Sequence, residues 1–199
     1  PAVYIDFEGQ KDERPVLLGI LVDDGVSDRF TQHIIDPRFH HLAPHGKSTI
    51  ASTLLDAVQD VPHEFPVYAW SSHEDTVLTE LADGNELILG LAERVINAIT
   101  IAEPWAKKNR DTWYPSPRPF RGRHTLDQYM AHVEYKVPSI HGPMNTGKRI
   151  AETLALLERE KPYDIWTRTQ KAKWTNLLEH NRHDCYGMRA VLDHIWRNL

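Results

Sequence analysis

Residues 2–35, AVYIDFEGQKDERPVLLGILVDDGVSDRFTQHII, contain three short apolar segments separated by polar residues. Residues 2–7 are apolar and partly β-branched, and residues 15–22 form a nearly continuous apolar run, which is typical of a strand buried on both faces. The Asp-Asp-Gly at residues 23–25 is a turn signal, and residues 29–35 have the composition of a third strand. Because strands joined by such short links can pair only in opposite directions, this stretch predicts an antiparallel meander.

The rest of the chain changes to helical spacing. Between residues 48 and 61 the apolar positions recur every three or four residues, which predicts a helix, and one more short strand is expected at residues 66–70. A meander followed by a helix, a strand and further helices predicts a mixed α/β fold around one sheet. The later helices are expected at residues 74–82, 85–101, 125–133, 147–159 and 169–198, the last of them interrupted.

Composition narrows the class of protein. The chain has 199 residues, which predicts a single domain, and its net charge of −5 is unsuited to coating nucleic acid by bulk charge alone. Cys185 is the single cysteine, so an internal disulfide is impossible and a reducing compartment is expected. No apolar run approaches the roughly 20 residues of a membrane-spanning helix, and residues 1–8 lack the pattern of a signal peptide. We therefore expect a cytoplasmic protein that does not engage a membrane.

Two acids on the first predicted strand carry the first chemical signal. Asp6 and Glu8 are two positions apart, so both side chains leave the same face of a strand. Adjacent like charges on a core strand are unfavourable unless a cation neutralises them, and Mg²⁺ and Mn²⁺ prefer such oxygen ligands. The alternative is an edge strand with one solvated face, on which the two acids need no ion.

A second acidic signal lies near the C-terminus. His180 and Asp184 are four positions apart, so they share one face of a helix. Asp184 also lies on an apolar stripe of that helix, where an aspartate needs a partner. That partner is either a metal ion or, as the plainer alternative, a salt bridge or a helix cap.

Together these motifs resemble those of the DEDD superfamily of 3′–5′ exonucleases, and most closely the RNase H-like nuclease domains associated with RecB-type proteins. The last motif of those domains reads Tyr-Asn-x-x-Asp-Cys, and residues 180–185, HNRHDC, match it except at the first position. Residues 70–74, WSSHE, resemble the middle motif and place Glu74 at the second acid. The resemblance runs in order from Val3 to about Trp196. It implies an RNase H-like fold, with an antiparallel N-terminal meander, parallel strands and flanking helices.

The chain departs from the family pattern at several positions. Glu74 stands where most of these exonucleases have aspartate, and the neighbouring Asp75 is the alternative. His180 replaces a tyrosine, and His183 is nearer to Asp184 in sequence, so the identity of the general base stays open. Asp127 resembles an aspartate that opens a middle helix in the relatives, and it is equally well explained as an ordinary helix-start residue.

The resemblance implies phosphodiester hydrolysis with two divalent ions, Mg²⁺ or Mn²⁺. Asp6 would bridge the ions, and Glu8, Glu74 and Asp184 would complete their ligand shells. His180 would orient or deprotonate the attacking water, because histidine titrates near neutral pH. No organic cofactor is called for.

A basic segment supplies candidate contacts to nucleic acid. Residues 105–123 carry six cations and one acid, interleaved with aromatic residues, and such a mixture suits single-stranded substrates. The alternative is a solvated loop whose aromatic residues pack on the core. We expect this segment to belong to a helical, basic insertion at about residues 85–123. Its candidate contacts are Lys107, Lys108, Arg110, Arg118, Arg121 and Arg123.

Residues 142–149, GPMNTGKR, nearly match a phosphate-binding loop that holds ATP. Arg149 occupies the position where that loop needs a hydroxyl group, so ATP binding is not expected. Lys148 instead resembles a lysine near a helix start in the related nuclease domains, where it would contact phosphate; the alternative is an exposed lysine at a helix start. The sequence as a whole predicts a metal-dependent nuclease, best matched to a 3′–5′ exonuclease acting on single-stranded DNA or RNA. The competing hypothesis is an inactive RNase H-like module that binds nucleic acid or a protein partner.

Overall fold

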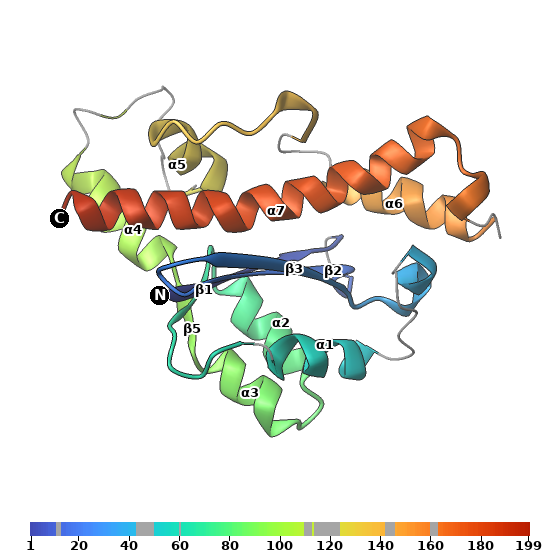
Figure 1. The fold of residues 1–199 in the computed structure, drawn as a ribbon, viewed down its shortest axis with the longest axis horizontal. Helices are drawn as coiled ribbons and strands as arrows, with labels where there is room; N and C mark the ends of the chain where they lie inside the picture. The colour runs from blue at the N-terminus through green and yellow to red at the C-terminus, as the bar shows by residue number, and fades with distance from the viewer. Residues whose placement is uncertain are drawn as a thin grey trace.

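A computed structural model describes most of the chain. The described residues are 1–10, 13–42, 50–59, 61–109, 113, 124–141, 146–159 and 163–199. They form one mixed sheet with helices on both faces (Figure 1). None of the helices in these ranges combines the length and the apolarity that crossing a bilayer requires.

The sheet has five strands in the order β3-β2-β1-β4-β5. The strands β1 (Ala2–Glu8), β2 (Leu17–Asp23) and β3 (Asp28–Ile34) pair antiparallel, as the turn signal predicted. The strands β4 (Val67–Ala69) and β5 (Val95–Asn97) extend the sheet in parallel from the other edge of β1. The predicted α/β fold with a mixed sheet is therefore confirmed, and its topology is consistent with an RNase H-like arrangement.

Helices cover each face of the sheet (Figure 1). One face carries α1 (Ile50–Gln59), α2 (His73–Leu81) and α3 (Glu86–Ala92). The other is crossed along its length by the long helix α7 (Arg168–Arg197), which α4 (Ile99–Lys108), α5 (Leu126–His132) and α6 (Thr146–Leu157) flank. Among the described residues, 3₁₀ turns also occur in the connections, at η1 (Pro37–Leu42), η3 (Ser139–His141) and η4 (Tyr163–Ile165).

The alternation of side chains along β1 builds a core on each side of the sheet. Val3, Ile5 and Phe7 join the apolar cluster under α1, α2 and α3, whereas Ala2 and Tyr4 join the cluster under α4, α5 and α7. Asp6 and Glu8 share the second face, so they point toward α7. Because β1 is the central strand, the alternative of a solvated edge strand is wrong.

Two predictions about helices are wrong. Residues 85–101, predicted as one helix, form α3, the short strand β5 and the start of α4. An apolar run of this kind does not by itself distinguish a buried strand from a helix, and pairing with β4 decides for the strand. Residues 169–198, predicted as an interrupted helix, belong to the uninterrupted helix α7, which a capping box between Thr167 and Gln170 begins.

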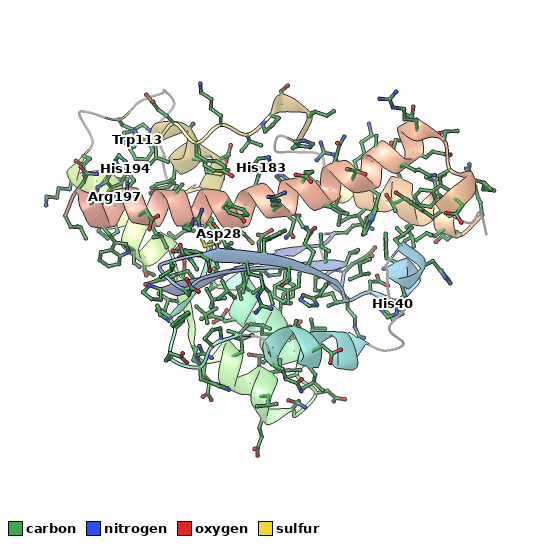
Figure 2. The ribbon with its side chains drawn as sticks, viewed as in Figure 1. Asp28, His40, Trp113, His183, His194 and Arg197 are labelled. Carbon is green, nitrogen blue, oxygen red and sulfur yellow. The ribbon has the colours of Figure 1, made fainter. Side chains whose placement is uncertain are left out.

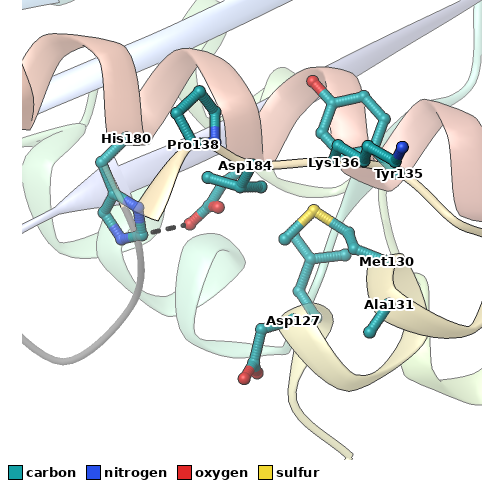
Figure 3. Close-up of a pocket in the computed structure, with 10 residues that line it drawn as sticks. Asp127, Met130, Ala131, Tyr135, Lys136, Pro138, His180 and Asp184 are labelled. Atoms are coloured by element: carbon teal, nitrogen blue, oxygen red, sulfur yellow. Dashed lines mark ion pairs between the residues drawn. The ribbon is translucent and has the colours of Figure 1, made fainter. Parts of the chain in front are cut away.

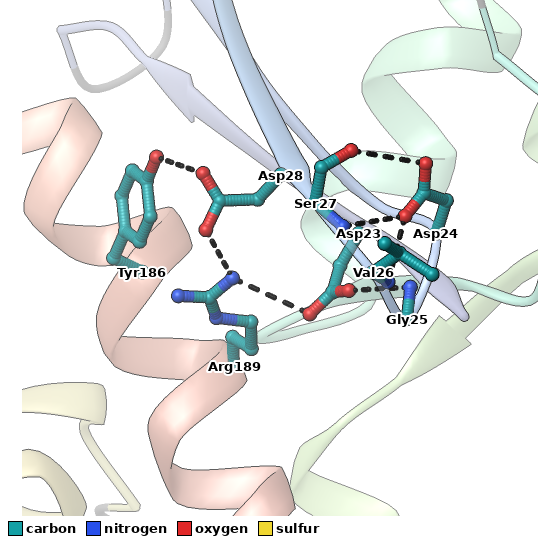
Figure 4. Close-up of polar contacts among 8 residues, drawn as sticks. All are labelled: Asp23, Asp24, Gly25, Val26, Ser27, Asp28, Tyr186 and Arg189. Atoms are coloured by element: carbon teal, nitrogen blue, oxygen red, sulfur yellow. Dashed lines mark hydrogen bonds and ion pairs between the residues drawn. The ribbon is translucent and has the colours of Figure 1, made fainter.

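A polar network fixes α7 against the hairpin of β2 and β3 (Figure 4). Nη1 of Arg189 lies 2.7 Å from Oδ2 of Asp28 and 3.3 Å from Oδ2 of Asp23, and the Tyr186 hydroxyl donates to Asp28 Oδ1 at 3.0 Å. Asp24 accepts hydrogen bonds within the turn, from the backbone N–H groups of residues 26 and 27. These contacts help to set the position along the sheet at which the polar middle of α7 meets β1.

Candidate active site

The acids predicted from the sequence gather where β1, the start of α2 and the middle of α7 approach one another. Asp6 and Glu8 leave the face of β1 that α7 covers, and Asp184 extends from α7 toward them. Glu74 is the second residue of α2, which follows the parallel neighbour of β1. The charges of Glu8, Asp184 and Glu74 each raise the pKa of Asp6, so all three acids lie within electrostatic reach of it.

Three side chains of this group lie closest together. One ligand atom each from Glu8, His180 and Asp184 lies within 4.8 Å of the others. His180 Nε2 lies 3.6 Å from Asp184 Oδ2 (Figure 3). The same atom lies 3.8 Å from Glu8 Oε1. Among the described residues, Glu8 Oε1 has no hydrogen-bond partner although Glu8 is only 6 % exposed. A buried carboxylate oxygen without a donor is the feature that a bound cation would satisfy.

An amide network holds Asp6. The side-chain amide of Asn181 donates to Asp6 Oδ2 at 2.8 Å and to the Asp6 carbonyl at 3.0 Å. Gln32 Nε2 in turn donates to Asn181 Oδ1 at 2.9 Å and to the Leu178 carbonyl at 2.8 Å. Asp6, Gly19 and Gln32 are neighbours in register across β1, β2 and β3, and Gly19 has no side chain to obstruct the contact. The network leaves Asp6 Oδ1 as the oxygen free of Asn181.

The surroundings of the four carboxyl groups disfavour their ionised forms. Burial raises the pKa of Asp6 and of Glu8 well above the ordinary values. The charges of Glu8, Asp184 and Glu74 raise the pKa of Asp6 further, and that of Asp184 raises the pKa of Glu8. Burial likewise raises the pKa of Glu74, and it raises that of Asp184 to about 7 with help from the charge of Asp127. Divalent cations would offset this cost, because they stabilise the ionised carboxylates.

Arg149 and Thr146, at the start of α6, oppose the effect of burial on the pKa of Glu8. The charge of Arg149 and a hydrogen bond from Thr146 both favour the ionised form of Glu8 and so lower its pKa. Burial, together with the same arginine, lowers the pKa of His180, so its ring is favoured in the neutral form. The site therefore combines acids with an imidazole whose pKa is lowered and with a nearby guanidinium.

The structure also distinguishes among the alternatives that the sequence left open. Glu74 accepts a hydrogen bond from Ser71 Oγ at 2.9 Å and acts on Asp6, whereas Asp75 accepts from the backbone of Thr76 at 2.7 Å. His183 lies on the side of α7 that faces away from the sheet (Figure 2), with its Nδ1 3.0 Å from the Tyr135 hydroxyl. Glu74 and His180, rather than their neighbours, therefore belong to the cluster.

A pocket opens beside the cluster (Figure 3). Its volume is about 760 Å³, and Asp184 and His180 form part of its wall. Asp127 lies at its rim, where its charge reaches Asp184. The remaining wall is mostly apolar and comprises Leu126, Met130, Ala131, Tyr135, Lys136, Val137 and Pro138.

The predicted nucleic-acid contacts are only partly described. Lys107 and Lys108 end α4, and Lys107 Nζ pairs with Glu103 Oε1 at 2.5 Å. Lys148 is an exposed residue in the first turn of α6. Arg110, Arg118, Arg121 and Arg123 lie outside the described residues.

Two aromatic residues of the same segment are packed rather than free. Trp105 is 4 % exposed, and Trp113 stacks on His132 with ring centroids 4.2 Å apart. Trp113 and His194 lie near the C-terminal end of α7 (Figure 2), and Trp105 contacts both. For Trp105 and Trp113, the alternative of aromatic side chains packed on the core is therefore correct.

Sequence reasoning missed the residues that support the acids. Asn181 lies inside the quoted C-terminal motif without an assigned role, and Gln32 carries no local signal at all. Gly19 interrupts an apolar strand, which is a recognised sign of a close approach by another group. No family model, curated protein or solved structure matches the chain. The mixed sheet order is consistent with an RNase H-like topology.

Proposed function

We propose that the protein is a divalent-metal-dependent nuclease, and specifically a 3′–5′ exonuclease acting on single-stranded DNA or RNA. One observation carries this proposal. Four largely buried carboxylates converge from β1, α2 and α7, and one of their oxygens, Glu8 Oε1, has no hydrogen-bond donor among the described residues. Ionising such a group of buried acids is unfavourable in the absence of cations and becomes favourable when divalent cations bind among them. Such cations also bind phosphate. The DEDD-type motifs of the sequence support the same conclusion.

The donor set fits two ions of the Mg²⁺ or Mn²⁺ class. Glu8 and Asp184 would hold one ion and Glu74 the second, with Asp6 between them. The hydrogen bond from Asn181 to Oδ2 would fix the Asp6 carboxylate and leave its Oδ1 free of Asn181 to bind an ion. When bound, such ions stabilise negative charge on the phosphate and lower the pKa of water.

The surrounding residues would direct the hydrolysis of a phosphodiester. The water oxygen bonds to phosphorus, the bond from phosphorus to the 3′ oxygen breaks, and the 3′ oxygen leaves with a proton. The neutral ring of His180 presents Nε2 to the acid pair, where it can accept the proton of water or bind an ion. Arg149, whose charge reaches Glu8 and His180, is placed to neutralise a non-bridging phosphate oxygen.

The pocket supports action at a strand end. Its apolar wall begins at Asp184, so a nucleoside inside it would place its phosphate at the acids. A volume of about 760 Å³ lies within the usual range for small-molecule sites and is large enough for a nucleoside. Lys136 contributes a cation to the wall, where a neighbouring phosphate would pass.

The test uses single strands of DNA and RNA labelled at the 5′ end, with Mn²⁺ or Mg²⁺ and with a chelator as control. Stepwise shortening in the presence of metal is expected. Asp184→Asn should abolish cleavage while the strand still binds, because only the metal ligand is lost. Asp193→Asn makes the same change on the same helix at a carboxyl outside the cluster, and it should cleave like the wild type.

Intact strands with every metal would contradict the proposal. If the strands nevertheless bind, the protein is the inactive module that the sequence left as the alternative. Equal activity of Asp184→Asn would place the active site elsewhere. Cleavage within a circular strand would replace exonuclease by endonuclease action.

A further inference from the structure

His180 occupies an unusual position for a residue that would only move protons. It lies on α7 one turn before Asp184, and its side chain is 12 % exposed. Its Nε2 is 3.6 Å from Asp184 Oδ2 and 3.8 Å from Glu8 Oε1. Hydrogen bonds between such atoms are about 2.7–3.2 Å long, so neither acid is hydrogen-bonded to the ring. A gap therefore separates Nε2 of His180 from each of the two carboxylate oxygens.

The dimensions of that space suit a metal ion. Ligands about 2.1 Å from one ion lie roughly 3.0–3.6 Å from each other, depending on the coordination geometry. The two separations from Nε2 are 3.6 and 3.8 Å, so shifts of a few tenths of an ångström would bring all three atoms onto one ion. A histidine that acted through an intervening water would instead stand about 4 Å or more from the ion.

Independent evidence that the space is a site comes from Glu8. The residue is only 6 % exposed, and its Oε1 has no hydrogen-bond donor among the described residues, yet that oxygen is the one that faces Nε2. A bound ion would satisfy this bare oxygen, which no described donor reaches.

The chemistry of the donors indicates which ion. Mg²⁺ takes oxygen ligands and retains water, whereas imidazole nitrogen suits the divalent transition metals. We propose that His180 is a direct metal ligand through Nε2, and that Glu8, His180 and Asp184 form a site that selects a divalent transition-metal ion such as Mn²⁺ over Mg²⁺. This proposal rests on the proposed function, from which it takes the second ion position and the substrate. It changes the role of His180 from general base to metal ligand.

The experiment measures coordination directly. Mn²⁺ is added to the full chain, and electron spin-echo modulation is recorded to detect ¹⁴N of a bound imidazole. The wild-type protein should show that coupling. His180→Gln should lose it and should bind Mn²⁺ about tenfold or more weakly by calorimetry, while Mg²⁺ affinity changes less than about threefold.

His183→Gln is the matched control, because it removes a histidine from the same helix that faces away from the cluster. This variant should keep the ¹⁴N coupling and the Mn²⁺ affinity. Circular dichroism checks that both variants fold, and the wild-type spectrum is decisive without either of them.

The outcomes separate this inference from the proposed function. If Mn²⁺ binds and strands are cut but the wild-type spectrum contains no imidazole coupling, His180 is not a ligand and the nuclease proposal stands. If the coupling is present and no strand is cut under any condition, the metal site stands and the nuclease proposal is wrong. Failure to bind Mn²⁺ at all would overturn the proposed site, whereas the nuclease proposal would still stand if strands were cut with Mg²⁺.

Discussion

Replacing Gly19 with alanine should damage the candidate site through Asn181, although Gly19 touches no substrate. A Cβ at this position would lie 2.3 Å from Oδ1 of Asn181 and 2.9 Å from its Cγ and Nδ2. Ordinary contact begins near 3.4 Å, so the amide would have to withdraw by about 1 Å. Asn181 is fully buried and held by its neighbours, so this movement has little room.

The magnitude follows from the bonds that the movement breaks. Asn181 donates to Asp6 Oδ2 at 2.8 Å and to the Asp6 carbonyl at 3.0 Å, and it accepts from Gln32 at 2.9 Å. A hydrogen bond to a charged group contributes about 1.5–3 kcal/mol and a neutral one about 0.5–1.5 kcal/mol. The free energy of unfolding should therefore fall by about 3 kcal/mol or more, a large part of the stability of a single domain.

Urea unfolding of the metal-free protein at neutral pH, followed by tryptophan fluorescence, measures this loss. Gly90→Ala is the matched control, because Gly90 lies in α3 and an added Cβ would meet nothing within 4 Å. That variant should be as stable as the wild type or more stable by about 0.5–1 kcal/mol. If Gly19→Ala unfolded at the same urea concentration as Gly90→Ala, the reasoning about Asn181 would be refuted.

Two further predictions concern charge. The pKa of Asp184 is raised to about 7 in the folded protein from an ordinary value of 3.8, so the stability contributed by its proton is complete below about pH 4 and is lost as the pH rises to 7. Without metal at pH 8, Asp184→Asn should therefore raise the free energy of unfolding by roughly 1–3 kcal/mol, and denaturant curves at several pH values should show the gain vanish near pH 4. Arg149→Ala should raise KM for a single strand about tenfold with kcat changed less than about threefold, because the guanidinium binds phosphate before the chemical step. Arg149→Lys should recover part of that loss in the same steady-state assay, and a fall in kcat alone would contradict a role in binding.

Much of the fold is encoded in local patterns of the chain. The turn at residues 23–25 and the apolar segments around it predict the antiparallel part of the sheet correctly. The period of two along β1 correctly places Asp6 and Glu8 on one face, and the period of four on α7 places His180 beside Asp184. Such patterns can be predicted because they depend on residues that are close together in sequence.

Other features depend on partners that are distant in sequence. The segment that became β5 is as apolar as a helix would be, and only its pairing with β4 makes it a strand. The polar residues in the middle of α7 do not interrupt the helix, because Asn181 finds partners on β1 and β3.

The candidate site divides in the same way. Its acids are recognisable from residue type and spacing, since each lies at a predictable place on its own strand or helix. The contact of Gln32 with Asn181, 149 positions apart, and the facing of His180 Nε2 with Glu8 Oε1 exist only after α7 has packed on the sheet. The directions of side chains across such an interface depend on how closely the helix packs on the sheet and on its rotation about its own axis. Neither quantity leaves a periodic pattern in the sequence.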